Sequence, residues 1–132
     1  MIQAYLETHY IVQSEVPLTL QCGVHNLELG LLQIAFNTES SAFITAYNPF
    51  SHVEDEISNT GRQRKLVQDL QDQGLTYFEG IGQHPSGVWP GEPSFLVLDL
   101  SLEEATQLGI KYEQNAIIWC GSDAVPQLVL LR

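Results

Sequence analysis

Short apolar runs, separated by glycine, proline and small polar residues, dominate the chain from residue 31 onward. Residues 31–36 and 42–47 are β-like runs, and the Asn-Thr-Glu-Ser-Ser segment between them is typical of a turn. The two runs are therefore predicted to form a β-hairpin. Asn48 is expected to end the second strand, because a residue that precedes proline avoids the helical region.

Two helices are predicted after this hairpin. The first follows Ser51 or Ser58, either of which could cap its N-terminus, and it ends before Gly74. The second begins with a capping box, in which Ser101 and Glu104 satisfy each other's free backbone amides. Further strands are predicted at residues 75–79, 94–98, 115–120 and 127–131.

The first thirty residues allow two interpretations. Apolar residues within 2–10 have the spacing of a short amphipathic helix. Residues 9–13 fit a strand equally well, because Tyr, Ile and Val favour one. Pro17, Gly23 and Gly30 break this region into short pieces.

Residues 42–120 thus follow the order β-α-β-β-α-β, which is that of a split βαβ or ferredoxin-like core. Right-handed crossovers would place both helices on one face of a mostly antiparallel sheet. The runs at 31–36 and 127–131 would extend its edges to five or six strands. With 132 residues and no repeat or linker, the chain is predicted to form a single α+β domain spanning residues 1–132.

The formal charge of −11 narrows the possible partners. Residues 1–61 and 66–110 contain no Lys or Arg. An acidic surface repels phosphate backbones, so no direct binding to duplex nucleic acid is expected. The charge suits solubility, the binding of a basic protein partner or the mimicry of nucleic acid.

A cytoplasmic location is expected from three features. No apolar run approaches the roughly 18 residues of a membrane span, so no membrane association is predicted. The N-terminus carries no Lys or Arg, unlike a secretory or transit signal. Cys22 and Cys120 form no metal-ligand pattern and are interpreted as free thiols in a reducing compartment.

The first predicted helix carries polar residues on its apolar face. Leu66 and Leu70 define that face, and at about 100° per residue Asn59 and Arg62 fall on it. They would point toward the end of the preceding strand and the start of the last one. The cluster expected there consists of Asn48, Asn59, Arg62, Gln114 and Asn115.

This cluster has a functional and a structural interpretation. Arg62 could grip a carboxylate or phosphate while the amides orient a small anionic or amide-bearing ligand. Alternatively, the same residues form a buried polar network that ties the helix to the sheet, or the first half of the helix is simply exposed.

Residues 80–93 are predicted to form a long loop that contains His84, Trp89 and Glu92. His84 and Glu92 are candidates for general acid–base catalysis, and Trp89 could cover an apolar ligand. Alternatively, Trp89 plugs the sheet edge and Glu92 caps backbone amides. The loop is expected to leave the sheet at the end opposite Asn48, so that it must fold back to reach the amide cluster.

No known signature assigns chemistry to the chain. GxGxxG, GxxxxGK[ST], HExxH and GxSxG are all missing from the sequence, and the four histidines show no ligand spacing. No cofactor or metal is therefore predicted. Gly80 and Gly82 form an isolated GxG, which is too short a motif to indicate phosphate binding.

Several blocks of the sequence carry a family resemblance. They are residues 44–49 (Ile-Thr-Ala-Tyr-Asn-Pro), 82–85 (Gly-Gln-His-Pro), 89–95 (Trp-Pro-Gly-Glu-Pro-Ser-Phe), 101–105 (Ser-Leu-Glu-Glu-Ala) and 114–117 (Gln-Asn-Ala-Ile). In these blocks the chain resembles domain-of-unknown-function family 3293. The resemblance implies a small bacterial, cytoplasmic, stand-alone domain, and it supplies no reaction or catalytic residues.

Three functions are compatible with the sequence. The first is a small-ligand-binding domain whose pocket contains Asn48, Asn59, Arg62, Trp89, Glu92, Gln114 and Asn115. The second is an acidic interaction module that engages a basic protein partner. The third is a small hydrolase-like enzyme that uses Glu92 or His84 as a general base, with Arg62 steadying negative charge.

Overall fold

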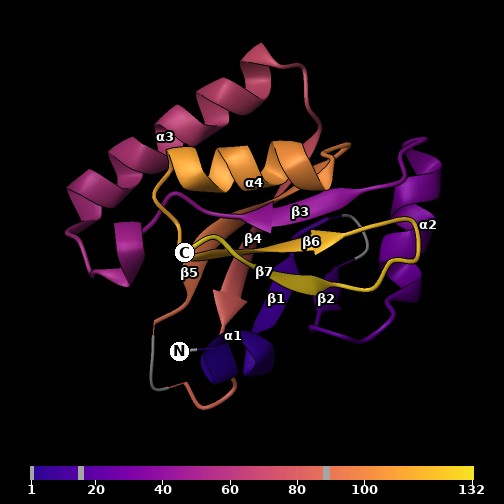
Figure 1. The fold of residues 1–132 in the computed structure, drawn as a ribbon, viewed down its shortest axis with the longest axis horizontal. Helices are drawn as coiled ribbons and strands as arrows, with labels where there is room; N and C mark the ends of the chain where they lie inside the picture. The colour runs from indigo at the N-terminus through magenta and orange to yellow at the C-terminus, as the bar shows by residue number, and fades with distance from the viewer. Residues whose placement is uncertain (1, 15–16, 88–89) are drawn as a thin grey trace.

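The computed structural model describes residues 2–14, 17–87 and 90–132 (Figure 1). The helices are α1 (Ile2–Glu7), α2 (Leu27–Ala35), α3 (Glu56–Asp72) and α4 (Leu102–Lys111), with a short 3₁₀ turn, η1, at Pro49–Ser51. The strands are β1 (His9–Val12), β2 (Leu18–Leu20), β3 (Ser41–Ile44), β4 (Tyr77–Gln83), β5 (Glu92–Leu98), β6 (Ala116–Cys120) and β7 (Gln127–Leu130). Within the described residues no helix is long and apolar enough to cross a membrane.

All the strands join one antiparallel sheet in the order β2-β1-β4-β5-β3-β6-β7. The fold is therefore α+β, and the predicted order β-α-β-β-α-β holds from β3 to β6. The prediction of five or six strands and two helices is too low, because the described chain has seven strands and four helices. The additional elements come mainly from the N-terminal region, where the helix interpretation holds for Ile2–Glu7 and the strand interpretation for His9–Val12.

The long helices α3 and α4 cover one face of the sheet, as predicted (Figure 1). Leu66 and Leu70 of α3 and Leu108 of α4 pack there against Ile44 and Val97 of the sheet. Burying each such side chain contributes about 1.5–3 kcal/mol, so this layer fixes where the N-terminus of α3 meets the sheet.

The structure confirms the predicted cap of α4 but not that of α3. Ser101 and Glu104 form the predicted capping box at the start of α4. The cap of α3 is neither Ser51 nor Ser58 but Asp55, whose carboxylate accepts a hydrogen bond from the backbone N–H of Ser58. A carboxylate at this position also complements the positive end of the helix dipole.

Residues 31–36 are not a strand, and the predicted hairpin is wrong. They lie mostly in α2, which begins at the cap Asn26 and buries Leu29 on the other face of the sheet. Gln33 holds the helix in place by accepting a hydrogen bond from Ser41 at 2.8 Å. A short apolar run fits a helix or a strand equally well. Here the Asn26 cap and the four-residue spacing of the buried Leu29 and Gln33 favour the helix.

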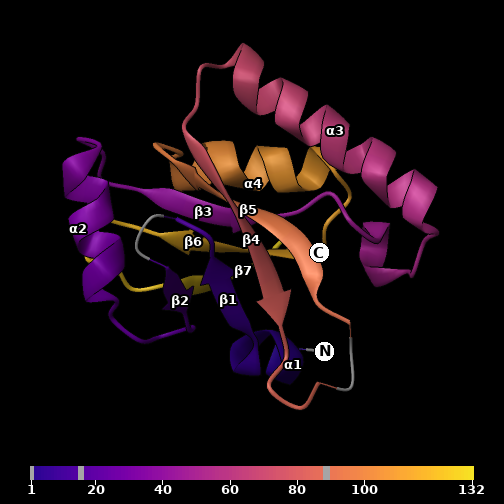
Figure 2. The ribbon, with the colours of Figure 1, turned by 180° about the vertical axis from the view of Figure 1, so that it is seen from behind.

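The connection between β4 and β5 is shorter than predicted, and it leaves the sheet at a different end. Residues 80–83 and 92–93 belong to strands, so only residues 84–91 connect them. Both β3 and β4 pair antiparallel with β5, so they run in the same direction. The connection therefore starts at the end of the sheet where β3 finishes and Asn48 lies, and it has no need to fold back. Figure 2 shows α1 at this same end.

Gly80 and Gly82 of β4 have different structural roles. A Cβ at Gly80 would lie 2.6 Å from the backbone oxygen of Ile11 and 2.8 Å from the Phe43 ring. The neighbouring strand β1 and the ring can approach only because this position lacks a side chain. A Cβ at Gly82 would meet nothing nearer than the Tyr10 ring at 3.7 Å.

We expect the substitutions Gly80→Ala and Gly82→Ala to separate these roles. Gly80→Ala should lower the free energy of unfolding by about 1–3 kcal/mol, because the added methyl group overlaps the backbone of β1. Gly82→Ala is the matched control and should change it by less than about 1 kcal/mol. Urea unfolding of both variants measures the difference, and equal stabilities would contradict the close approach at Gly80.

Candidate functional site

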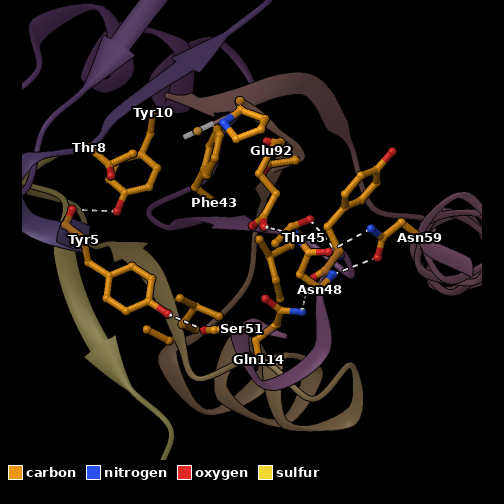
Figure 3. Close-up of a pocket in the computed structure, with 18 of the residues that line it drawn as sticks. Tyr5, Thr8, Tyr10, Phe43, Thr45, Asn48, Ser51, Asn59, Glu92 and Gln114 are labelled. Carbon is orange, nitrogen blue, oxygen red and sulfur yellow. Dashed lines mark hydrogen bonds between the residues drawn. The ribbon is translucent and has the colours of Figure 1, made fainter. Parts of the chain in front are cut away.

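A cavity of about 460 Å³ lies at the end of the sheet where β3 and β4 finish and β5 and β6 begin (Figure 3). The strand register aligns Tyr10, Gly82 and Glu92 across β1, β4 and β5. Residues directly opposite one another in a sheet share a face, so these three positions face the cavity together. Because Gly82 has no side chain, the middle of this row is open.

Aromatic side chains form one wall of the cavity. Tyr5 comes from α1, Tyr10 from β1 and Phe43 from β3. The Tyr10 and Phe43 rings meet edge to face with centroids 5.2 Å apart, and the Tyr10 hydroxyl donates to the backbone oxygen of Tyr5 at 2.7 Å. Burial raises the pKa of Tyr10, so this hydroxyl keeps its proton at physiological pH.

Glu92 is the most perturbed carboxyl group of the cavity. It begins β5 and is largely withdrawn from solvent, and this desolvation raises its pKa from 4.5 to about 6. The Asn48 amide donates to Glu92 Oε2 at 3.1 Å, which favours the ionised form and limits the rise. Near neutral pH, Glu92 therefore presents a poorly solvated carboxylate to the cavity.

A reciprocal pair of hydrogen bonds between Asn48 and Asn59 holds this arrangement. The backbone N–H of Asn48 donates to Asn59 Oδ1, and Asn59 Nδ2 donates to Asn48 Oδ1, both at 2.8 Å. Asn48 has a φ of 47°, in the left-handed region that asparagine tolerates better than most residues. The pair fixes the direction in which Asn48 presents its amide to Glu92.

Gln114 and Asn115 support the same end of the sheet in different ways. Gln114 lines the cavity, and its amide nitrogen donates to the backbone oxygens of Tyr47 and Tyr112. Asn115 does not line the cavity but donates to Ser51 Oγ at 2.8 Å. Asn115 therefore holds η1, whose Ser51 lines the cavity.

Arg62 is close to this network but does not line the cavity. Its guanidinium donates to the backbone oxygens of Ala46 and Tyr112 at 2.9 and 2.8 Å, and it pairs with Glu113 at 3.2 Å. For Arg62, the geometry matches the structural interpretation, in which the cluster ties α3 to the sheet. In the functional interpretation, Arg62 and the amides bind an anion together. That interpretation needs the guanidinium inside the cavity, and Arg62 does not line it.

The remaining candidates have different positions. His84 lines the cavity, and its ring contacts Ser86 Oγ at 2.7 Å and Glu7 Oε1 at 3.4 Å. Trp89 lies outside the described residues, so its predicted role stays a prediction. Among the described residues, no three His, Cys, Asp or Glu side chains cluster closely enough to hold a metal ion.

The sequence interpretation missed the aromatic wall. Tyr5, Thr8, Tyr10 and Phe43 line the cavity, yet none of them was a candidate. Tyr10 lies in β1, whereas Thr8 comes just before it. The pairing of Tyr10 with Gly82 of β4 joins residues about seventy positions apart, and no local pattern reveals such a contact.

We expect Arg62→Ala to destabilise the protein. The variant leaves two backbone oxygens without their charged donor, which should lower the free energy of unfolding by roughly 1.5–3 kcal/mol. Arg64→Ala is the matched control, because Arg64 is exposed on the same helix, and its effect should stay within about 0.5 kcal/mol. Urea unfolding measures both, and equal effects would exclude Arg62 as a structural tie.

A second prediction concerns the pH dependence of stability. The pKa of Glu92 is higher in the folded chain than its ordinary value, so ionisation costs stability as the pH rises from 4.5 to about 6. Glu92→Gln should therefore exceed the wild type in stability at about pH 7, by at most about 2 kcal/mol, and lose this advantage near about pH 4. Unfolding across this range measures the difference.

The control for this experiment is Glu79→Gln, which removes an exposed carboxylate from the neighbouring strand β4. Its stability relative to the wild type should not vary with pH in the same manner. An advantage of Glu92→Gln that stays constant with pH would show that the carboxylate is not desolvated.

Comparison with known proteins supports the resemblance seen in the sequence blocks. Residues 44–117 match the family described as Protein of unknown function (DUF3293). No curated protein and no solved structure matches the chain. The matched segment includes Asn48, Asn59, Glu92 and Gln114, whereas the aromatic wall precedes it. Since the match covers more than half of the 132 residues, the chain belongs to the DUF3293 family.

Proposed function

We propose that this protein is a small-ligand-binding domain and that its ligand occupies the cavity beside Glu92. The observation that carries the proposal is the desolvated carboxylate of Glu92, which Asn48 holds at 3.1 Å in a cavity of about 460 Å³. Ligand sites commonly measure about 300–1,000 Å³ and combine apolar walls with a few oriented polar groups.

The ionised side chain of Glu92 costs folding stability, which favours a role in ligand binding over a role in stabilising the fold. An ionised carboxylate that loses water without gaining a positive partner destabilises the folded chain. No Lys or Arg belongs to the described residues that line the cavity, so none of these residues supplies a permanently charged partner there. Perturbed groups of this kind concentrate at functional sites. A ligand with positive charge would compensate the loss here.

The enzyme hypothesis receives weaker support from the same geometry. Glu92 has the raised pKa that suits a general base near neutral pH. However, Arg62 donates to backbone oxygens outside the cavity, and the His84 ring contacts Ser86 and Glu7. Arg62 therefore lies outside the cavity, and two other side chains engage the His84 ring, so we favour binding over catalysis.

A fragment screen followed by NMR tests the proposal. We expect at least one amine, amide, nucleoside or carboxylate fragment to shift the backbone amides around Asn48 and Glu92 in a saturable manner. Gly82→Val should lower the affinity for that fragment by about tenfold or more, because the valine side chain enters the open space between Tyr10 and Glu92. Gly61→Ala, an exposed change on α3, is the control and should leave the affinity unchanged.

Circular dichroism and thermal unfolding establish that Gly82→Val is folded before its affinity is compared. A fragment that binds Gly82→Val as well as the wild type would place the binding site elsewhere. A screen in which no fragment shifts the cavity amides would contradict the proposed function.

A further inference from the structure

We propose that the cavity selects a cationic nitrogen group, such as an amidinium, guanidinium or primary ammonium, carried on a flat apolar body. The inference rests on the proposed binding function and names the chemical class of the ligand. It comes from the balance of hydrogen-bond donors and acceptors in the cavity, from the sign of its charge and from its aromatic wall.

The amide donors around the cavity are already engaged. Asn59 Nδ2 donates to Asn48 Oδ1 and to the backbone oxygen of Glu54, and Gln114 Nε2 donates to two backbone oxygens. An amide NH₂ group has two hydrogens, so these two groups have none left for a ligand. Asn48 Nδ2 directs one of its two hydrogens to Glu92.

Acceptors, in contrast, remain open to the cavity. Among the described residues, Glu92 Oε1 and Gln114 Oε1 receive no hydrogen bond, although both residues line the cavity. Figure 3 shows the carboxylate of Glu92 and the amide of Gln114 directed toward one another across it. A ligand that complements this arrangement must donate hydrogen bonds, and more than one of them.

The charge of the lining residues indicates that the ligand should also be positively charged. Glu54, Glu56 and Glu92 belong to the lining, and no Lys or Arg among the described residues does. His84 also lines the cavity, but its ring lies 3.4 Å from Glu7 Oε1. An anion would therefore meet three carboxylates with no Lys or Arg in the described lining, whereas a cation would restore a partner to the desolvated Glu92. Planar N–H groups also match a carboxylate in paired, charge-assisted hydrogen bonds.

The aromatic wall favours a flat cation over a compact one. Tyr5, Tyr10 and Phe43 border the space into which Glu92 points (Figure 3). Their rings attract positive charge through their faces and bury the apolar surface of a planar ligand. A group that places its N–H donors on Glu92 would therefore rest its body against this wall.

Three probes with the same ring but different charge test the inference: benzamidine as a cation, benzamide as a neutral donor and benzoate as an anion. Each is titrated into ¹⁵N-labelled wild type, Glu92→Gln and Glu79→Gln at about pH 7.5, where benzamidine is charged and Glu92 is ionised. The shifts of backbone amides around Asn48 and Glu92 report binding. Glu79→Gln is the matched control, because it removes the same charge from an exposed site on β4.

We expect benzamidine to bind the wild type at least about tenfold more tightly than benzamide, and benzoate to give no saturable shift. Glu92→Gln should remove most of the preference for benzamidine over benzamide, and Glu79→Gln should retain it. Thermal unfolding establishes that both variants are folded. The result for Glu92→Gln is evaluated as the ratio of the benzamidine and benzamide affinities, so that a general loss of affinity is not mistaken for a loss of preference.

Each other outcome has a defined consequence. If benzamide or benzoate binds the cavity as tightly as benzamidine, the cationic class is wrong while the proposed binding function stands. A preference for benzamidine that survives in Glu92→Gln would also overturn the inference. If none of the three probes shifts the cavity amides, the inference fails, whereas the proposed function fails only when the wider fragment screen is also silent.

Discussion

The paired hydrogen bonds between Asn48 and Asn59 are the constraint on which this end of the molecule depends. They join the loop that follows β3, where Asn48 lies, to the first turns of α3, which contain Asn59. Asn48 also accepts from the backbone N–H of Glu54 and donates to Glu92. One side chain thus holds the loop after β3, the start of α3 and the start of β5 in a single arrangement, and Asn59, only 3% exposed, fixes that side chain.

The division of charge around this pair explains why the cavity is acidic. Arg62 lies one turn beyond Asn59 on α3, yet its guanidinium turns away from the cavity toward the backbone oxygens of Ala46 and Tyr112. Those oxygens lie where the chain leaves β3 and α4, so a fixed donor there stabilises both ends. The positive charge of Arg62 is thereby committed to holding the fold, and Glu92 has no ion pair among the described residues.

Local patterns in the sequence predicted some, but not all, of the parts of this structure that depend on local contacts. The capping box of α4 and the inward position of Asn59 follow from spacing alone. The outward turn of the Arg62 guanidinium does not, because a long side chain can bend to either side of the end of β3 that it reaches. The relation between Asn48 and Glu92 required knowing that β3 and β4 run in the same direction, which is a property of the whole crossover. The strand predicted at residues 31–36 is wrong for a different reason, since their apolar composition fits either a helix or a strand.

The two glycines of β4 show how a motif can be judged by its setting. In a loop before a helix, a GxG segment brings backbone amides to a phosphate. Here the segment lies in a strand, so its period of two places both glycines on the same face of the sheet. Gly80 lets β1 and Phe43 approach, and that approach brings Tyr10 opposite Gly82. Gly82 then leaves open the space that Tyr10 and Glu92 border from either side. The aromatic wall and the carboxylate therefore face one cavity because two side chains are missing from the strand between them.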